Sequence, residues 1–141
     1  MDEQQTVAAF ELAMQTQKPE FENFFLARFL GMSFEYPDET CLISFDVKEF
    51  MFNPQGTVHG GIIATVMDIS MGHLLKRFGI TGTTLEMKTQ YVKAVRAGRL
   101  QCRGEVVRRG RTISFLKSTL MDEDGTVLAV ATATWMALKQ E

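Results

Sequence analysis

The chain of 141 residues has the length of one domain; 45% of its residues are hydrophobic and 23% are charged. These proportions are typical of a globular protein with its own core, so we expect a single domain over residues 1–141. Fifteen Lys and Arg stand against 17 Asp and Glu, which gives a formal charge of −2. That balance excludes a general electrostatic attraction to nucleic acid or to an anionic membrane, and we expect neither as a partner.

Cysteine usage and hydrophobic stretches exclude further classes. Cys41 and Cys102 are the only cysteines, too few for a disulfide framework and without metal-ligand spacing, so we expect reduced thiols and no metal. The polar residues 1–5 do not form a secretory signal. The stretch 51–67 has no charged residue, but it contains Asn53, Pro54 and His59 and cannot span a membrane. These features favour a cytoplasmic protein.

The first third of the chain is predicted to pass from helix to strand. Residues 3–17 are typical of a short helix. Aromatic residues at helical spacing predict a second helix that follows Pro19 and ends at Gly31, with a stripe formed by Phe21, Phe24, Phe25 and Phe29. Alternating residues then predict two strands around a turn at 37–39, over residues 32–36 and 40–47.

After a loop at 50–59, residues 60–77 predict one long helix. Everything beyond it is strand-like, with predicted strands at 83–93, 99–109, 112–121 and 126–138. In the first of these strands, alternation predicts one face that carries Leu85, Met87, Thr89 and Tyr91. Because helices and strands do not alternate along the chain, we expect an α+β fold. Its antiparallel sheet, with the last four strands as a meander, wraps around the long helix.

The long helix is apolar on almost every face, and Asp68 is its only charge before Lys76 and Arg77. The residues three and four positions away are uncharged, so no ion pair forms along this helix. A buried, unpaired carboxylate is costly, and burial raises its pKa. Asp68 is therefore either a polar residue at a hydrogen-bonded or wet helix edge, or a base or nucleophile made reactive by desolvation.

Gly60 and Gly61 begin this helix and leave its first N–H groups unobstructed. Such a terminus suits a carbonyl oxygen that becomes an anion during acyl transfer, although tight loop-to-helix packing also explains a glycine pair. Asp68 lies eight residues beyond Gly60, about 12 Å along the axis, so one acyl carbon cannot contact both in one chain. If both serve one reaction, a two-fold dimer with antiparallel helices must supply them from different subunits.

The string Asn53-Pro54-Gln55-Gly56-Thr57-Val58-His59-Gly60-Gly61, followed by Asp68, resembles the hotdog-fold acyl-CoA thioesterases of the phenylacetic-acid-degradation type. The order of elements agrees over nearly the whole chain after residue 30, and the segments 90–98 and 108–112 fit as well. The resemblance implies a hotdog fold and hydrolysis of acyl-CoA thioesters without metal or organic cofactor. It also implies homodimers joined sheet edge to sheet edge, which often pair into homotetramers.

Carried over by position, the resemblance implies that the Gly60 N–H polarises the thioester carbonyl and that Asp68 of the partner activates water or attacks directly. Asn53 and His59 are expected to shape the pocket and to hold the substrate carbonyl or water. Thr84 stands at the position of a hydroxyl that orients water, where the family more often has Ser. His73 is expected to be a satisfied or surface histidine.

Coenzyme A carries several phosphate charges, which arginine and lysine bind well. Basic residues gather near the predicted strand ends and the turn at Gly110. We expect this group to contact the phosphates: Lys93, Arg96, Arg108, Arg109 and Arg111.

Three other functions compete with thioester hydrolysis. A dehydratase or hydratase that acts on acyl thioesters places its His and acidic residues differently, and no such motif surrounds Asp68. A non-catalytic acyl-CoA-binding module has no need of the base. A structural dimerisation domain without a ligand leaves Asp68 and the glycines unexplained. The sequence leaves open whether the acyl group is aryl, medium-chain or long-chain, and whether the assembly is a dimer or a tetramer.

Overall fold

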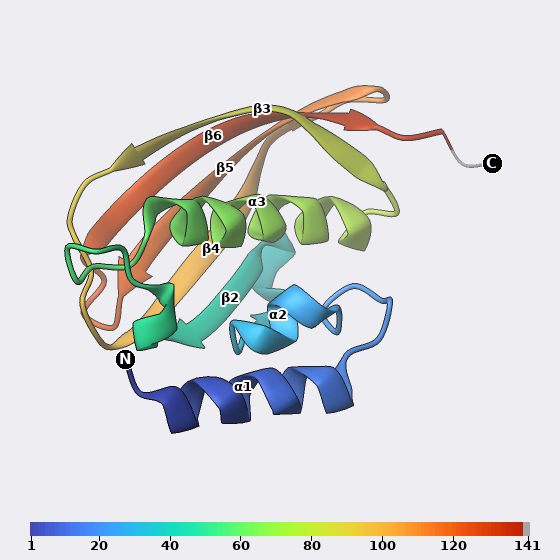
Figure 1. The fold of residues 1–141 in the computed structure, drawn as a ribbon. Coiled ribbons are helices and arrows are strands. Elements are labelled where there is room, and N and C mark those ends of the chain that lie inside the picture. The colour runs from blue at the N-terminus through green and yellow to red at the C-terminus, as the bar shows by residue number, and fades with distance from the viewer. Residues whose placement is uncertain (140–141) are drawn as a thin grey trace.

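A long helix, α3 (Gly60–Arg77), lies within the curve of a six-stranded antiparallel sheet in this computed structural model, which describes residues 1–139 (Figure 1). The helix begins where the His59 side chain accepts a hydrogen bond from the Gly61 N–H, and Gly79, at φ 78°, follows its end. Its apolar sequence is buried by the sheet and the N-terminal segment. The buried residues are Ile63, Val66, Met67, Ser70, Met71, His73, Leu74 and Leu75.

The strand bounds are β1 Ser33–Glu35, β2 Cys41–Asp46, β3 Gly82–Tyr91, β4 Arg99–Arg109, β5 Ile113–Asp122 and β6 Val127–Ala137. They confirm the predicted strands within a few residues. The predicted four-strand meander is wrong, because the order across the sheet is β1-β2-β4-β5-β6-β3. Only β4, β5 and β6 form a meander. Since α3 carries the chain across the sheet, β3 starts at the far edge, beside β6, and residues 92–98 bring the chain back to β4.

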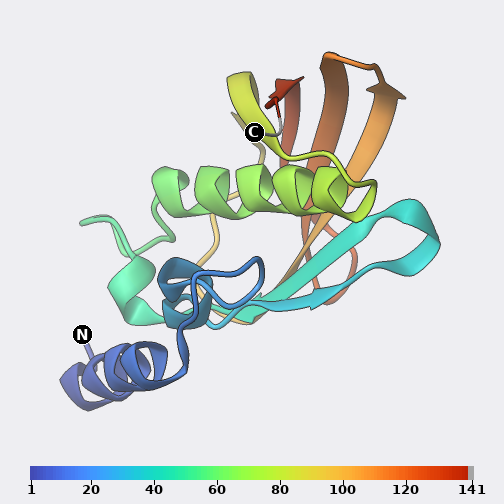
Figure 2. The ribbon, with the colours of Figure 1, turned by 90° about the vertical axis from the view of Figure 1, so that its right-hand side faces the viewer.

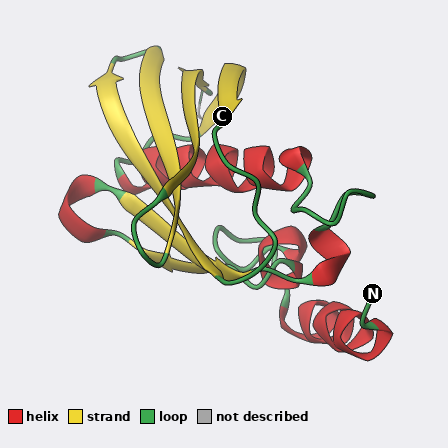
Figure 3. Cartoon of the chain, turned by 90° about the vertical axis from the view of Figure 1, so that its left-hand side faces the viewer, coloured by secondary structure: helices red, strands yellow, loops and turns green. Residues whose placement is uncertain are grey.

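Two helices, α1 (Glu3–Thr16) and α2 (Phe25–Phe29), lie on the side of α3 away from β5 and β6 (Figures 2 and 3). The second helix begins later than predicted, and Phe21 and Phe24 are not part of it. Glu22 prevents the helix from starting before Phe25. Its φ is 73°, outside the helical range, and its N–H donates to His73 Nε2 at 3.0 Å. Phe21 and Phe24 instead pack around the His73 ring, which is satisfied as expected.

The core between α3 and the sheet holds a short chain of polar groups. Ser70 Oγ donates to the Met67 carbonyl oxygen at 2.7 Å and lies 2.8 Å from Ser118 Oγ, which lies 3.1 Å from Cys102 Sγ. All three side chains are buried, and each has a partner. Burial raises the pKa of Cys102 to about 11 and that of Cys41 to about 12, so both thiols stay protonated at neutral pH.

Gly104 on β4 allows α3 to lie this close to the sheet. A Cβ at this position would stand 2.5 Å from the Ser70 carbonyl oxygen, a backbone atom that cannot move alone. Within residues 1–139, none of the helices combines the length and the apolar character needed to cross a bilayer.

We expect Gly104→Ala to lower the free energy of unfolding by about 1–3 kcal/mol, the usual cost of overpacking a core. The sign is informative, since Gly to Ala in an unobstructed strand stabilises. Urea denaturation measures the change, with Gln101→Ala on the opposite face of β4 as the control. An equal or higher stability of Gly104→Ala would show that α3 does not press on this glycine.

Candidate active site

Asp68 lies half-buried on α3, on the side that faces the edge strand β3. The Thr84 hydroxyl donates a hydrogen bond of 2.6 Å to Asp68 Oδ1. Among the residues that the structure describes, no cation forms a salt bridge with Asp68. Burial raises the pKa of Asp68, and the hydrogen bond from Thr84 lowers it by a smaller amount. The Asp68 carboxylate thus accepts a hydrogen bond from one hydroxyl and forms no ion pair in the described chain.

A β-bulge in β3 turns Thr84 toward α3. Thr84 pairs with Trp135, but Glu86 pairs with Thr134, so Leu85 is an extra residue in this strand. The prediction that Leu85 shares one face with Met87 is therefore wrong, and Leu85 is 51% exposed. Beyond the bulge, Met87 packs against the core. Without the extra residue, Thr84 and Met87 would face opposite sides of the sheet.

The N-terminus of α3 is the second part of the predicted site. His59 is exposed, and its Nδ1 accepts the Gly61 N–H at 2.8 Å. The Gly60 N–H has no acceptor among residues 1–139. Tyr91 covers this glycine: its hydroxyl donates to the Gly60 carbonyl oxygen at 2.9 Å, and a Cβ on Gly60 would stand 3.2 Å from its ring. A side chain at position 60 would require the exposed Tyr91 ring to move by a few tenths of an ångström, whereas the glycine fits without such a shift. The Gly60 N–H remains free within the described chain.

Asn53 is occupied by its own loop. Its Oδ1 accepts the backbone N–H groups of Gln55 at 3.0 Å and Thr57 at 3.2 Å, and its Nδ2 donates to Thr57 Oγ1 at 2.9 Å. These bonds shape the turn that leads to His59. A direct contact of Asn53 with substrate stays a prediction.

The predicted residues form two groups in one chain. Asp68 and Thr84 are together, while Gly60 and His59 are at the helix start with Asn53 in the loop before it. Because α3 is one unbroken helix of 18 residues, the separation of about 12 Å along its axis holds.

The five predicted phosphate contacts are also divided. Lys93 and Arg96 precede β4 and lie beside the 50–59 loop, since the Val58 N–H donates to the Val95 carbonyl oxygen at 2.9 Å. Arg108, Arg109 and Arg111 are at the other end of β4, about 33 Å away at about 3.3 Å per residue. In one chain the five residues do not form one cluster.

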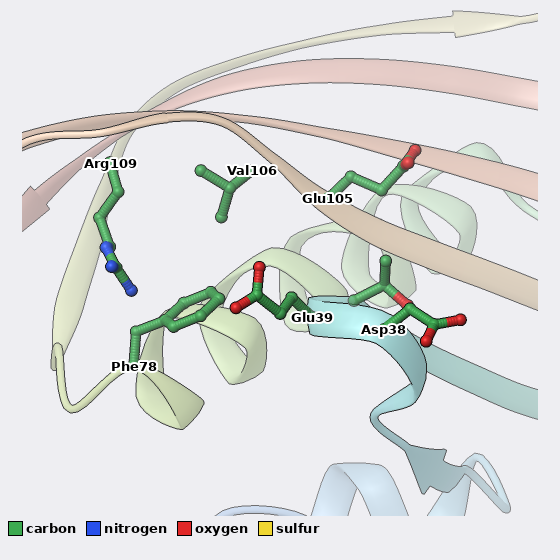
Figure 4. Close-up of a pocket in the computed structure, with 7 residues that line it drawn as sticks. Asp38, Glu39, Phe78, Glu105, Val106 and Arg109 are labelled. Carbon is green, nitrogen blue, oxygen red and sulfur yellow. The ribbon is translucent and has the colours of Figure 1, made fainter.

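Arg109 has surroundings that oppose a phosphate. Its guanidinium lies 4.3 Å from the centre of the Phe78 ring, a cation–π contact. Both residues line a cavity of about 400 Å³, in which Arg109, Phe78 and Glu39 point toward one another (Figure 4). Asp38 and Glu105 also line it, but their carboxylates point away from Arg109 (Figure 4). An anion beside the Arg109 guanidinium would meet the Glu39 carboxylate in the same cavity.

Sequence reasoning missed two contributors to this geometry. One is the bulge at Leu85, which alternation cannot reveal. The other is Tyr91. Alternation predicts its strand correctly but does not predict its contact with Gly60. The one feature of the sequence that could have indicated this contact is an aromatic residue on the strand that follows a helix beginning with Gly-Gly. Within residues 1–139, no group of three or more His, Cys, Asp or Glu side chains could hold a metal ion.

The sequence pattern of one protein family matches residues 55–129, more than half of the chain. The chain belongs to the thioesterase superfamily. Its six-stranded sheet around α3, with a helical N-terminus, is the hotdog fold of this superfamily. The matched region includes Gly60, Asp68 and Thr84.

Relatives of this thioesterase-superfamily chain share little sequence but most of its length. The medium/long-chain acyl-CoA thioesterase YigI of Escherichia coli strain K12 is 26% identical over 129 residues, which cover 77% of this chain and 83% of YigI. A hypothetical thioesterase protein of Streptococcus pneumoniae, solved with coenzyme A, is 26% identical and has a TM-score of 0.74. The match covers 79% of this chain and 91% of that protein. BH2602 of Bacillus halodurans, solved with CoA, is 22% identical and has a TM-score of 0.84. The match covers 98% of this chain and 92% of BH2602 and shows that the two share a fold.

The raised pKa of Asp68 predicts how its replacement changes stability with pH. An unfolded Asp titrates near 3.9, and burial raises the folded pKa above that value. Folding therefore takes up a proton between the two pKa values, and the stability from this group is lost as pH rises through the folded pKa. We expect Asp68→Asn to raise Tm at pH 7 and to change it less near pH 4.

Thermal unfolding at several pH values measures this effect, with Asp124→Asn in an exposed turn as the matched control. A lower Tm of Asp68→Asn at pH 7 would contradict a desolvated carboxylate at this position.

Proposed function

We propose that the chain is an acyl-CoA thioesterase, of the phenylacetic-acid-degradation type, with one domain over residues 1–141. It hydrolyses acyl-CoA to the free acid and CoA. The observation that carries this proposal is the Asp68 carboxylate, half-buried, held by Thr84 and unpaired with any cation in the described chain. Membership of the thioesterase superfamily supports the reaction, as do relatives named acyl-CoA thioesterase or solved with coenzyme A.

The proposal includes a homodimer, because the two parts of the site are too far apart in one chain. The strand β3 is an edge of the sheet, and the side chains of Leu85 and Tyr91 on it are 51% and 54% exposed. An unpaired edge is a template for another strand. Two-fold pairing of β3 with the partner's β3 would continue the sheet and align two α3 helices in opposite directions. Gly60 of one subunit then approaches Asp68 of the other, in two equivalent sites. Two such dimers are proposed to pair where the assembly is a tetramer.

In the proposed reaction, the thioester carbonyl oxygen accepts a hydrogen bond from the Gly60 N–H at the positive end of the helix dipole. Asp68 of the other subunit takes a proton from water, and the hydroxide attacks the carbonyl carbon. The tetrahedral intermediate collapses, the C–S bond breaks, and the CoA thiolate leaves and is protonated. Thr84 fixes the carboxylate and orients the water.

A second route starts from the same atoms. Asp68 attacks the carbonyl carbon directly and forms a mixed anhydride, which water then opens. In both routes one water is consumed and one thiol is released. His59 and Asn53 shape the loop beside the carbonyl. Neither route uses a metal or an organic cofactor.

A thiol-release assay over aryl, medium-chain and long-chain acyl-CoA thioesters tests the activity. We expect wild type to release CoA and Asp68→Asn to lose about 10²–10⁴-fold in kcat, the usual effect of a general base. Binding of acyl-CoA without thiol release would instead identify a binding module, and loss of water from a 3-hydroxyacyl thioester to form the enoyl thioester would identify a dehydratase. The preferred acyl group decides whether the phenylacetic-acid-degradation type holds.

Mixed dimers test whether the site is shared. Asp68→Asn removes the base, and Gly60→Pro removes the N–H at a position where a helix tolerates proline. A dimer with one variant of each kind has one site with both parts intact, so co-expression should restore about half of the wild-type activity per dimer, as its symmetry predicts. Each variant alone should stay defective, Gly60→Pro by about 10²–10³-fold. No recovery in purified mixed dimers would locate both functions in one chain.

Paired substitutions test the phosphate contacts. We expect Lys93→Ala/Arg96→Ala and Arg109→Ala/Arg111→Ala to raise KM for acyl-CoA and to leave kcat mostly intact. The first pair should have the larger effect, because Arg109 packs on Phe78 in a cavity that Glu39 also lines. Kinetics at low and high salt measure the difference, since added salt weakens exposed ionic contacts. An unchanged KM for both pairs at every ionic strength would remove these residues from the binding site.

A further inference from the structure

Trp135 on β6 is the only tryptophan of the chain, and its side chain lies between the sheet and α3 with 6% of it exposed. It packs against Gly72, where an added Cβ would stand 2.7 Å from Cη2 and 3.1 Å from Cζ3. The indole Nε1 is buried and has no hydrogen-bond partner in the described chain. A buried donor without an acceptor costs free energy that a phenylalanine ring would avoid. The tryptophan therefore needs an explanation beyond filling the core.

Three contacts place Trp135 next to the Asp68–Thr84 pair. Trp135 is the strand partner of Thr84, so both side chains lie on the same face of the sheet, about 5 Å apart at Cβ. Thr84 in turn donates to Asp68. Gly72 is four residues beyond Asp68, on the same face of the helix. The ring thus closes the space one helical turn from the carboxylate.

The orientation of the indole supports this placement. Its Cε3 atom faces Gly82, since a Cβ there would stand 3.3 Å from it and 3.4 Å from Leu75 Cδ1. Nε1 is on the opposite edge of the indole. The edge with the unpartnered N–H is therefore turned away from Gly82 and Leu75. These two residues lie on the side of the ring away from Asp68.

We propose that Trp135 is a positioning residue for Asp68, a wedge between β6 and Gly72 that sets the spacing at which Thr84 reaches the carboxylate. The wedge also keeps water from one side of that carboxylate. This inference rests on the proposed role of Asp68 in thioester hydrolysis. The glycine at position 72 is the complementary half of the wedge, because any side chain there would push α3 away from the sheet.

Charged neighbours do not provide an alternative account of the Asp68 environment. β6 has no titratable residue, and on β3 the nearest one, Glu86, accepts the Thr134 hydroxyl on the outer face at 2.7 Å. Lys88, also on β3, is exposed. On α3, His73 packs among Phe21, Phe24 and Phe34, and Lys76 and Arg77 contact the rings of Phe21 and Tyr36. Desolvation is the main cause of the raised pKa of Asp68, and the proposed wedge would contribute to it by excluding water.

A fluorescence titration tests the placement without any assay of activity. Because Trp135 is the only tryptophan, its emission reports one site, and a carboxyl that changes charge beside an indole changes that emission. We expect an emission change between pH 4 and 8 in wild type and none in Asp68→Asn, with Asp124→Asn like wild type. The same transition in Asp68→Asn would overturn the proposal.

A size exchange tests the wedge itself. Gly72→Ala inserts a methyl group that collides with the indole, and Trp135→Phe removes the part of the ring that occupies this space. We expect each variant to lower kcat more than it raises KM and to move the acid limb of the pH–kcat profile down, toward the ordinary Asp pKa of about 3.9. The double variant should regain most of the kcat and of the acid limb. Ile43→Ala, a core truncation on β2, should lower Tm but leave the acid limb unchanged.

The outcomes separate the two proposals. Absence of thiol release from wild type overturns the proposed function, and the fluorescence titration then decides alone whether Trp135 controls Asp68. Thiol release that depends on Asp68, with an unchanged acid limb in Gly72→Ala and Trp135→Phe, overturns the wedge and leaves the function standing.

Discussion

The hydrogen bond between Thr84 and Asp68 is the constraint on which the geometry of this molecule depends. A carboxylate on an apolar helix loses hydrating water when the helix packs. No cation in the described chain offsets this cost of desolvation by forming a salt bridge with Asp68. One hydroxyl therefore has to reach it from the neighbouring strand. The rotation of α3, the distance between α3 and β3 and the direction of Thr84 together meet this requirement. An apolar side chain at position 68 would avoid this desolvation cost, so the presence of a carboxylate there supports the catalytic role proposed for Asp68.

Two close approaches hold α3 in this position, and both depend on glycine. Gly104 lets the backbone at Ser70 touch β4, and Gly72 accepts the edge of Trp135 from β6. The helix is thus seated against the sheet at two positions within four residues of Asp68. The buried hydroxyls of Ser70 and Ser118 add directional contacts that apolar packing lacks. Small shifts of α3 would break hydrogen bonds rather than merely loosen the core.

Much of this fold was predictable from local pattern, and the functional detail was not. The bounds of α3 followed from a helix that is apolar on all sides, begins at Gly60 and ends in two cations. Strand order was missed because pairing of β3 with β6 depends on contacts far apart in the sequence. The aromatic stripe was misread because Glu22 bonds to His73, 51 residues away. Thr84 was placed by resemblance, since strict alternation puts Leu85 on one face with Met87, and a one-residue bulge removes Leu85 from that face and brings Thr84 to it.

The bulge also explains how one edge strand can serve two purposes. Beyond it, β3 keeps the regular pairing with β6 that leaves its other edge open for a second chain. Before it, the strand turns Thr84 inward to the carboxylate. A regular strand could not present Leu85 outward at the open edge and both Thr84 and Met87 inward, because successive side chains alternate. The extra residue thus lets the surface proposed to bind the partner lie directly beside the base. If the partner's helix N-terminus arrives along this edge, assembly and completion of the site become a single event, and an isolated chain carries the base without its oxyanion donor.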